Sequence, residues 1–199
     1  MSSIKKQKLN LLLSNLNLKI IQRYLSSLLS SCIIYSKLRQ NSEIDFFLMS
    51  SQVYPASLIL KMDSTLSASN LLVDIAVVDY PLKQSRFFLN YSFLSMSNIR
   101  FNLQTSLSEL TSILSITSLW RNAVWHEREC FDFFGIYFTH HKDLRRILTD
   151  YGFQGFALRK DFPVSGFIEF FYDDNQRRVV SRKTELTQVW KKWVFKTTW

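Results

Sequence analysis

The sequence has few of the residues that bend or cross-link a chain: 4 Gly, 3 Pro and 2 Cys among 199 residues. The two cysteines, Cys32 and Cys130, are far apart in the sequence, so no disulfide framework is expected. An iron–sulfur cluster usually takes four cysteine ligands, and this chain therefore cannot hold one alone. All four glycines fall within 135–166, where we expect backbone turns that other residues resist.

Long apolar runs are also missing. The longest uncharged stretches, 24–36 and 46–60, are too short for a membrane-spanning helix or are interrupted by Pro55. Contact with a membrane is therefore expected to be peripheral or to go through partners.

Acidic residues are absent before Glu43. Of the net charge of +9, seven positive charges lie in residues 1–42, and the remaining residues carry 18 positive and 16 negative charges. A nucleic-acid-binding domain would carry a basic face on its folded part, so no nucleic-acid partner is expected. The basic first segment is the only support for an alternative, an organellar RNA- or ribosome-associated protein.

That first segment has apolar residues at helical spacing over 8–38. They are Leu9, Leu12, Leu13, Leu16, Ile20, Tyr24 and Leu28. A basic, acid-free, Ser-rich helix is typical of a mitochondrial transit peptide. We expect either an uncleaved signal or, preferably, a protein made inside the organelle. The apolar stripe with Leu9, Leu12, Leu16 and Ile20 would then dock on a neighbouring subunit, with membrane-surface binding as the lesser alternative.

What is abundant is apolar surface, because 47% of the residues are hydrophobic and 17 are Phe. Strands are expected at Glu43–Met49, at the apolar run Leu71–Tyr80, and at Arg86–Phe93 and Asn98–Gln104, where apolar and polar residues alternate. Pro55 suits the first turn of a short helix that carries Leu58, Ile59 and Met62. These elements predict an α+β fold, a small, mostly antiparallel sheet with helices on one face.

A second helix is expected from Thr117 or Ser118 to Phe134, with Gly135 just past its end. Beyond it the pattern predicts an extended, weakly structured C-terminal tail, with one strand at 168–172 and a short helix at 186–195. This tail is rich in Phe and Trp, so it needs a partner surface to bury them. The predicted parts are thus a basic helical extension at 1–42, an α/β domain at 43–135 and an extended docking segment at 136–199.

Charged residues cluster on the second helix and after it. His126 and Glu127 begin like a zinc-protease helix, but the second His is absent and Cys130 takes its place, so no metal site is expected. A hydrolase using His126, Glu127 and Glu129 is a rival interpretation. We favour charge pairs that fix a turn or a subunit contact, with no catalytic, cofactor-binding or metal residues. The structural or interface residues expected are Glu127, Arg128, Glu129, Asp132, Arg145, Arg146, Asp150, Arg159, Lys160 and Asp161.

Several ordered motifs carry a resemblance. They are Trp125-His126-Glu127-Arg128-Glu129, Asp132-Phe133-Phe134-Gly135-Ile136, the run from Asp143 to Phe153, Leu158-Arg159-Lys160-Asp161-Phe162-Pro163, Tyr172-Asp173-Asp174 and Arg178-Val179-Val180. Together they resemble the thirty-kilodalton subunit of respiratory complex I over about residues 70–199. The sequence departs from that family where Gln154-Gly155-Phe156-Ala157 replaces the usual Glu-Gly-His-Pro, and it has Lys142 where Pro is usual.

The resemblance implies a structural, non-redox subunit in the hydrophilic arm of the proton-pumping NADH:ubiquinone oxidoreductase. It implies a place on the matrix side of the mitochondrial inner membrane, beside the large quinone-site subunit and an adjacent iron–sulfur subunit. The complex uses FMN, iron–sulfur clusters and ubiquinone, whereas this chain is expected to bind no cofactor and to have no active site of its own. Its contribution would be positional: it would hold the cluster-bearing subunits at electron-transfer distance.

Overall fold

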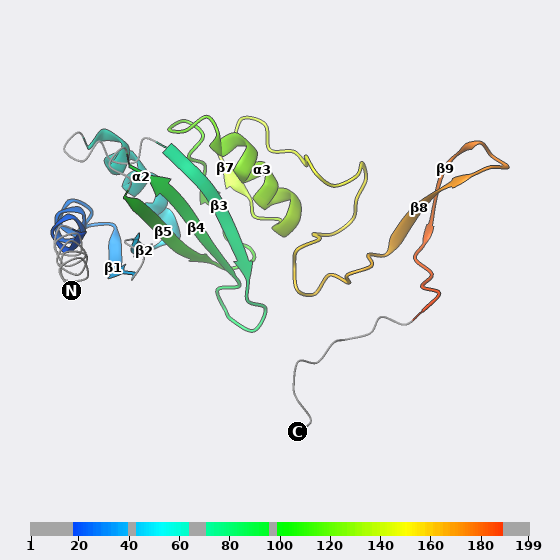
Figure 1. Cartoon of the computed structure of the whole chain (residues 1–199), viewed down its shortest axis with the longest axis horizontal. Helices are drawn as coiled ribbons and strands as arrows, with labels where there is room; N and C mark the ends of the chain where they lie inside the picture. The colour runs from blue at the N-terminus through cyan, green and yellow to red at the C-terminus, as the bar shows by residue number, and fades with distance from the viewer. Residues whose placement is uncertain (1–17, 40–42, 64–70, 96–98, 189–199) are drawn as a thin grey trace, which may run out of the picture. The chain divides into compact units, whose positions relative to one another are not determined.

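The structure is a computed structural model that describes residues 18–39, 43–63, 71–95 and 99–188 (Figure 1). Contacts divide the chain into two compact units, Met1–Lys160 and Asp161–Trp199. Residues 136–160 therefore belong with the first unit, although the sequence analysis assigned them to the C-terminal segment. The reason is that side chains of the first unit hold this stretch in place, as described below. The docking role of 136–199 remains a prediction.

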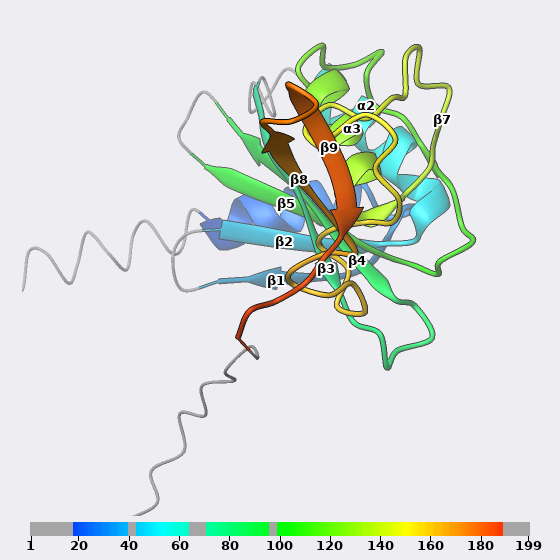
Figure 2. The ribbon, with the colours of Figure 1, turned by 90° about the vertical axis from the view of Figure 1, so that its right-hand side faces the viewer.

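A five-stranded sheet organises the first unit, and its strand order is β1-β2-β5-β4-β3. Its strands are β1 (Ile33–Leu38), β2 (Glu43–Leu48), β3 (Leu71–Asp79), β4 (Phe87–Leu94) and β5 (Arg100–Leu107). Figure 2 shows β1, β2 and β5 side by side. The pair β2–β5 is parallel and the other pairs of this sheet are antiparallel, which confirms the predicted α+β fold with a mostly antiparallel sheet.

The helices cover one face of this sheet. They are a helix at residues 18–28, α2 (Val53–Met62), preceded by the short η1 (Ser50–Gln52), and α3 (Ala123–Phe134). On β4 every second side chain is buried beneath them: Phe87, Leu89, Tyr91 and Phe93. The core lies between this face and the helices. A two-stranded parallel pair, β6 (Ile113–Leu114) and β7 (Phe138–Thr139), brackets α3 in the sequence.

The N-terminal segment corrects one prediction. The described helix ends at residue 28, and residues 33–38 form strand β1 instead of continuing the helix. Its buried face carries Leu18, Leu25 and Leu29, whereas Ile20 is 57% exposed. Leu25 packs into the chain's own core, and docking of the face with Ile20 on a neighbouring subunit stays a prediction. Leu9, Leu12 and Leu16 lie outside the described residues.

The second predicted helix begins later than expected. Residues 117–122 form turns, and α3 starts at Ala123 after Asn122. The Asn122 side chain does not cap the helix but donates a 2.6 Å hydrogen bond to the carbonyl of Leu72 on β3. The predicted end is confirmed, because Gly135 takes a left-handed conformation with φ of 76°. No helix in the described part of the chain is long and apolar enough to cross a membrane.

The second unit contains a β-hairpin. The predicted strand is confirmed as β8 (Ile168–Asp173), and it pairs with β9 (Arg178–Lys183), which the sequence analysis missed. Residues 186–188 of the predicted C-terminal helix are not helical, and residues 189–195 lie outside the described residues. Both faces of the hairpin expose apolar side chains, because the consecutive residues Phe170 and Phe171 point to opposite faces and are 54% and 39% exposed.

Candidate functional site

The charged residues of α3 do not share one surface. Glu127, Arg128 and Asp132 are buried, whereas Glu129 is exposed. The hydrolase interpretation needs Glu127 and Glu129 together, but Glu127 faces the interior and Glu129 faces solvent. Within the described residues no group of three His, Cys, Asp or Glu side chains is placed to hold a metal ion. The site is therefore a set of polar contacts that bind the segment after α3 to the first unit.

Asp132 lies at the centre of these contacts. Its carboxylate accepts hydrogen bonds from the backbone N–H groups of Ile147, Leu148 and Thr149 at 3.2, 2.8 and 2.9 Å, and from the Thr149 hydroxyl at 2.5 Å. Burial opposes ionisation, but the hydrogen bonds from Thr149, Leu148 and Arg146 outweigh it and lower the pKa of Asp132 to about 2. The carboxylate thus accepts the hydrogen bonds of backbone N–H groups that would have carbonyl partners in a regular helix or strand.

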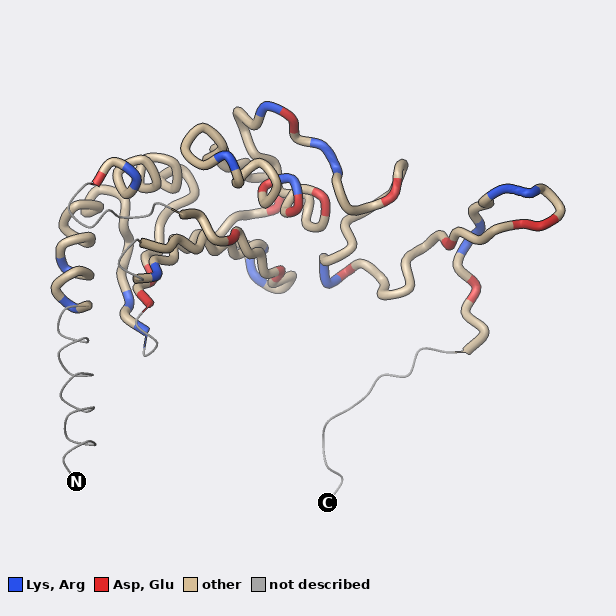
Figure 3. The backbone as a smooth tube through the Cα atoms, turned by 45° about the horizontal axis from the view of Figure 1, so that its top comes forward, with Lys and Arg blue, Asp and Glu red and all other residues tan. Residues whose placement is uncertain are grey.

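Arg146 joins the same turn to the next one. Its Nη1 donates to the Asp132 carboxylate at 3.0 Å and its Nη2 donates to the carbonyl of Gly155 at 2.8 Å. The guanidinium also lies 5.1 Å from the centre of the Phe156 ring. Figure 3 shows the basic and acidic residues along this segment. One side chain therefore fixes two consecutive turns.

Phe156 is held between two arginines. Arg159 lies 4.4 Å from the centre of the ring and donates through Nε to the carbonyl of Phe134 at 2.7 Å. The ring packs directly against Gly135, where a Cβ would come within 2.5 Å of it. Phe156 thus makes two cation–π contacts, one with Arg146 and one with Arg159, which a neutral aromatic ring favours.

The end of the segment is bonded to the sheet. Asp79 at the end of β3 is buried, pairs with Arg86 at 2.8 Å and accepts a 2.8 Å hydrogen bond from the backbone N–H of Lys160. The side-chain hydrogen bond from Arg86 keeps the pKa of Asp79 below its usual value despite partial desolvation. Arg159 also pairs with Glu109, which lies 3.5 Å from Arg86, so the end of the segment joins a network of two arginines and two carboxylates.

Arg128 completes the attachment from the helix. It is buried and donates to the carbonyls of Arg145 and Arg146 at 3.1 and 3.4 Å. Its guanidinium lies 5.3 Å from the centre of the Trp125 ring. Buried guanidinium groups need such acceptors, and the backbone of the segment supplies them.

Glu127 is fully buried and accepts a 2.8 Å hydrogen bond from the backbone N–H of Ile116. Its other oxygen has no partner among the described residues. Burial raises the pKa of Glu127 to about 7, against smaller opposing contributions from the hydrogen bonds of Ser115 and Ile116. Tyr91 on β4 lies near it, and burial together with the Glu127 charge raises the pKa of the Tyr91 hydroxyl.

The remaining predicted residues lie on the surface. Arg145 pairs with the exposed Asp143 at 2.9 Å, and Asp150, Lys160 and Asp161 have exposed side chains. Asp161 begins the second unit. Asp79, Thr149 and Phe156 were not expected as contact residues. Asp79 lies in the predicted strand Leu71–Tyr80, Thr149 lies within the run from Asp143 to Phe153, and no local pattern distinguishes any of the three from its neighbours.

The sequence of this chain is similar to those of known proteins. Residues 48–168 match the family described as the respiratory-chain NADH dehydrogenase, 30 Kd subunit. The chain is 39% identical to NADH-ubiquinone oxidoreductase subunit 9 of Reclinomonas americana over 98% of this chain and 93% of that protein. It is 46% identical to NADH dehydrogenase [ubiquinone] iron-sulfur protein 3 of Oryza sativa subsp. japonica over 77% of this chain and 81% of that protein.

A solved structure supports the fold. The trypsin-resistant fragment (1-134) of Nqo5 superposes with a TM-score of 0.51 at 22% identity, over 62% of this chain and 98% of that fragment. Taken together, these matches define a subunit of a respiratory-chain NADH dehydrogenase. The chain belongs to the family of the 30 kDa subunit of mitochondrial complex I, NADH dehydrogenase (ubiquinone). They give no support to the RNA- or ribosome-associated alternative.

Proposed function

We propose that this chain acts in the hydrophilic arm of complex I as a structural, non-redox subunit. It positions the large quinone-site subunit and the adjacent iron–sulfur subunit relative to each other. The observation that carries this proposal is the attachment of residues 143–160 to the first unit. Asp132, Arg146 and Arg159 fix this stretch, which ends where the second unit begins in the sequence.

The second unit supports the docking half of the proposal. Its hairpin exposes Phe167, Ile168, Phe170 and Tyr172 at 47–61%. A two-stranded hairpin with apolar side chains on both faces is marginal alone in water. Burying each such ring on a partner contributes roughly 1.5–3 kcal/mol. The hairpin and the segment beyond it therefore gain most of their stability from neighbouring subunits.

The chain itself would hold no flavin, iron–sulfur cluster or metal. Cys32 and Cys130, the two thiols of the chain, are both buried, and Cys130 Sγ donates to the carbonyl of Ile75 at 3.5 Å. Two thiols on different elements do not make a cluster site. Elemental analysis of the purified chain is expected to find no stoichiometric iron or zinc, and either metal at one atom per chain would contradict this part.

We also propose that the chain works on the matrix side of the inner membrane and is encoded in the organelle. The basic, acid-free N-terminal segment and the family membership support this location.

The proposed positioning role is tested by a crosslinking map of native membranes from the source organism. Crosslinks from residues 161–199 to the quinone-site subunit and to an iron–sulfur subunit are expected. Crosslinks to neither of these subunits, in a complex that contains the chain, would overturn the proposed positioning role.

A further inference from the structure

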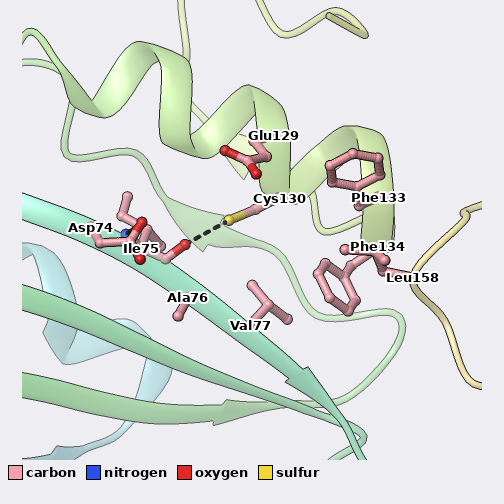
Figure 4. Close-up of a pocket in the computed structure, with 9 residues that line it drawn as sticks. All are labelled: Asp74, Ile75, Ala76, Val77, Glu129, Cys130, Phe133, Phe134 and Leu158. Carbon is pink, nitrogen blue, oxygen red and sulfur yellow. Dashed lines mark hydrogen bonds between the residues drawn. The ribbon is translucent and has the colours of Figure 1, made fainter. Parts of the chain in front are cut away.

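A groove lies between α3 and β3, on the first unit. It encloses about 240 Å³ (Figure 4). Ala76 and Val77 line it from the strand, and Cys130, Phe133 and Phe134 line it from the helix. Pockets for drug-sized ligands usually enclose roughly 300–1,000 Å³, so this space suits a single side chain better than a cofactor.

The strand side of the groove is the open edge of the sheet, because β3 is the last strand. Neighbouring groups already cover much of this edge: Asn122 donates to the carbonyl of Leu72 at 2.6 Å, and Cys130 donates to that of Ile75 at 3.5 Å. Outward-facing backbone groups alternate along a strand, so those of Val77 face the same way as those of Ile75. In the described part of the chain no hydrogen bond reaches the outward carbonyl of Val77.

One end of the groove is acidic. Asp74 and Glu129 line it there, and Figure 4 shows both beside Cys130. Burial raises the pKa of the Cys130 thiol, and the negative charges of Glu129, Glu127 and Asp74 raise it further, which marks a negative potential in this space. Asp74 has a neighbour in His126 at 3.4 Å, whereas Glu129 forms no ion pair within the described ranges.

We propose that this groove receives the basic side chain of an extended segment from a neighbouring subunit of complex I. The aliphatic stem of a lysine or arginine would lie on Val77 and Phe133, and its charged head would reach Asp74 and Glu129. A backbone N–H of the same segment would donate to the open carbonyl of Val77. The inference rests on the proposed place of the chain within the complex, and it adds a specific docking surface and the chemistry of its partner.

The first test removes only the two negative charges. Native complex carrying Asp74→Asn and Glu129→Gln is titrated with KCl, and release of the subunit is followed on native gels. Both substitutions are isosteric and lie at exposed carboxyl groups, so the fold is retained. The KCl concentration for half release is expected to fall at least about twofold, because the lost attraction is a partly desolvated ion pair. The matched control is Asp143→Asn, which removes an exposed charge outside the groove.

Equal salt release for the double variant and the control would overturn the inference and leave the place of the chain in the complex intact. Absence of the chain from the complex would instead remove the proposed function itself.

The second test identifies the occupant. Cells are grown with a photoreactive leucine analogue, and the isolated complex is irradiated and mapped by mass spectrometry. Leu158 lines the groove and is 52% exposed, so its analogue would react with whatever lies there. A crosslink from Leu158 to a Lys- or Arg-containing peptide of another subunit is expected. Crosslinks only to residues of this chain, or none from Leu158, would overturn the inference.

Discussion

The guanidinium of Arg146 lies 3.0 Å from the Asp132 carboxylate on one side and 5.1 Å from the centre of the Phe156 ring on the other. Asp132 belongs to α3, and Phe156 lies ten residues beyond Arg146. One arginine thus connects the helix with both turns of residues 143–160. The segment has no long regular hydrogen-bond ladder, and its order depends on side chains that reach across it.

Asp132→Asn should destabilise the first unit. The amide loses the negative charge that accepts five donors, and its NH₂ group meets backbone N–H groups as a second donor. We expect a loss of about 2–4 kcal/mol in the free energy of unfolding. Urea denaturation of the purified chain at pH 7 measures it. Asp150→Asn, which removes an exposed carboxylate of the same segment, is the control and should change stability little.

The pH dependence of the same group has a defined sign. The folded pKa of Asp132, about 2, lies below the ordinary aspartate value of 3.8, so its contribution is complete above the unfolded pKa and is lost as the pH falls towards 2. The difference in stability between the native chain and Asp132→Asn should therefore shrink between about pH 5 and pH 2. A difference that stays constant over this range would contradict the assigned role of the carboxylate.

The contribution of Glu127 to stability depends on pH with the opposite sign. Its folded pKa of about 7 lies above the ordinary glutamate value of 4.5, so the folded state binds the proton more tightly. The stabilisation that Glu127 contributes is complete below the unfolded pKa and is lost as the pH rises through the folded pKa. The chain should lose on the order of 3 kcal/mol between about pH 5 and pH 8 from this group.

The variant that isolates this effect is Glu127→Gln. Glutamine keeps an oxygen for the N–H of Ile116 but cannot ionise, so its stability should be nearly flat over the same pH range. Denaturation curves at several pH values measure both proteins. Parallel curves for the two would show that the carboxyl group titrates with a normal pKa.

Phe156→Leu tests the two cation–π contacts. Leucine keeps most of the apolar contact with Gly135 but has no ring face for Arg146 and Arg159. The free energy of unfolding should fall by about 1–2 kcal/mol. Tyr151→Leu, which removes a fully exposed ring from the same segment, is the control and should change stability little. Equal losses for the two variants would indicate that the Phe156 ring face does not hold the segment.

Gly135→Ala should be costly for two separate reasons. The backbone there has φ of 76°, and the new Cβ would lie 2.5 Å from the Phe156 ring. We expect a loss of about 1–3 kcal/mol from the backbone conformation and more from the clash. In Gly135→Ala with Phe156→Leu the second part should be relieved, so the two losses should sum to more than the loss of the double variant. Strict additivity would contradict the close contact.

The sequence predicted the sheet better than the ends of the helices. Strands β4 and β5 follow from alternation, because one face is covered by helices, and β3 follows from its apolar run ended by Pro81. The start of α3 did not follow, because Thr117 and Ser118 look like caps but lie in turns before it. The burial of Leu25 within this chain was not predicted either, since it depends on tertiary packing that no local pattern encodes.

The candidate site was predicted in composition but not in geometry. Charge clustering identified Asp132, Arg146 and Arg159, and their pairing within one chain fits the structural interpretation. The roles of Thr149 and the Gly155 carbonyl depend on backbone atoms of an irregular segment. Backbone donors and acceptors are the same at every position, so a sequence does not show which of them a carboxylate or guanidinium will meet.

The last prediction concerns a chain shortened after Pro163, which lacks the hairpin β8–β9 and everything beyond it. The first unit ends at Lys160, and its core residues and the contacts of Asp79, Asp132 and Arg159 all lie before that point. The truncated chain should therefore fold with an urea midpoint close to that of the full chain. It should fail to enter complex I, because the exposed rings of the second unit supply the contact with neighbouring subunits.

Native gels of mitochondria that express the truncated chain measure assembly. The matched variant with intact length carries Phe170→Ser and Tyr172→Ser in the full-length chain. Normal levels of complex I with the truncated chain would mean that the second unit is dispensable and that docking rests on the first unit alone.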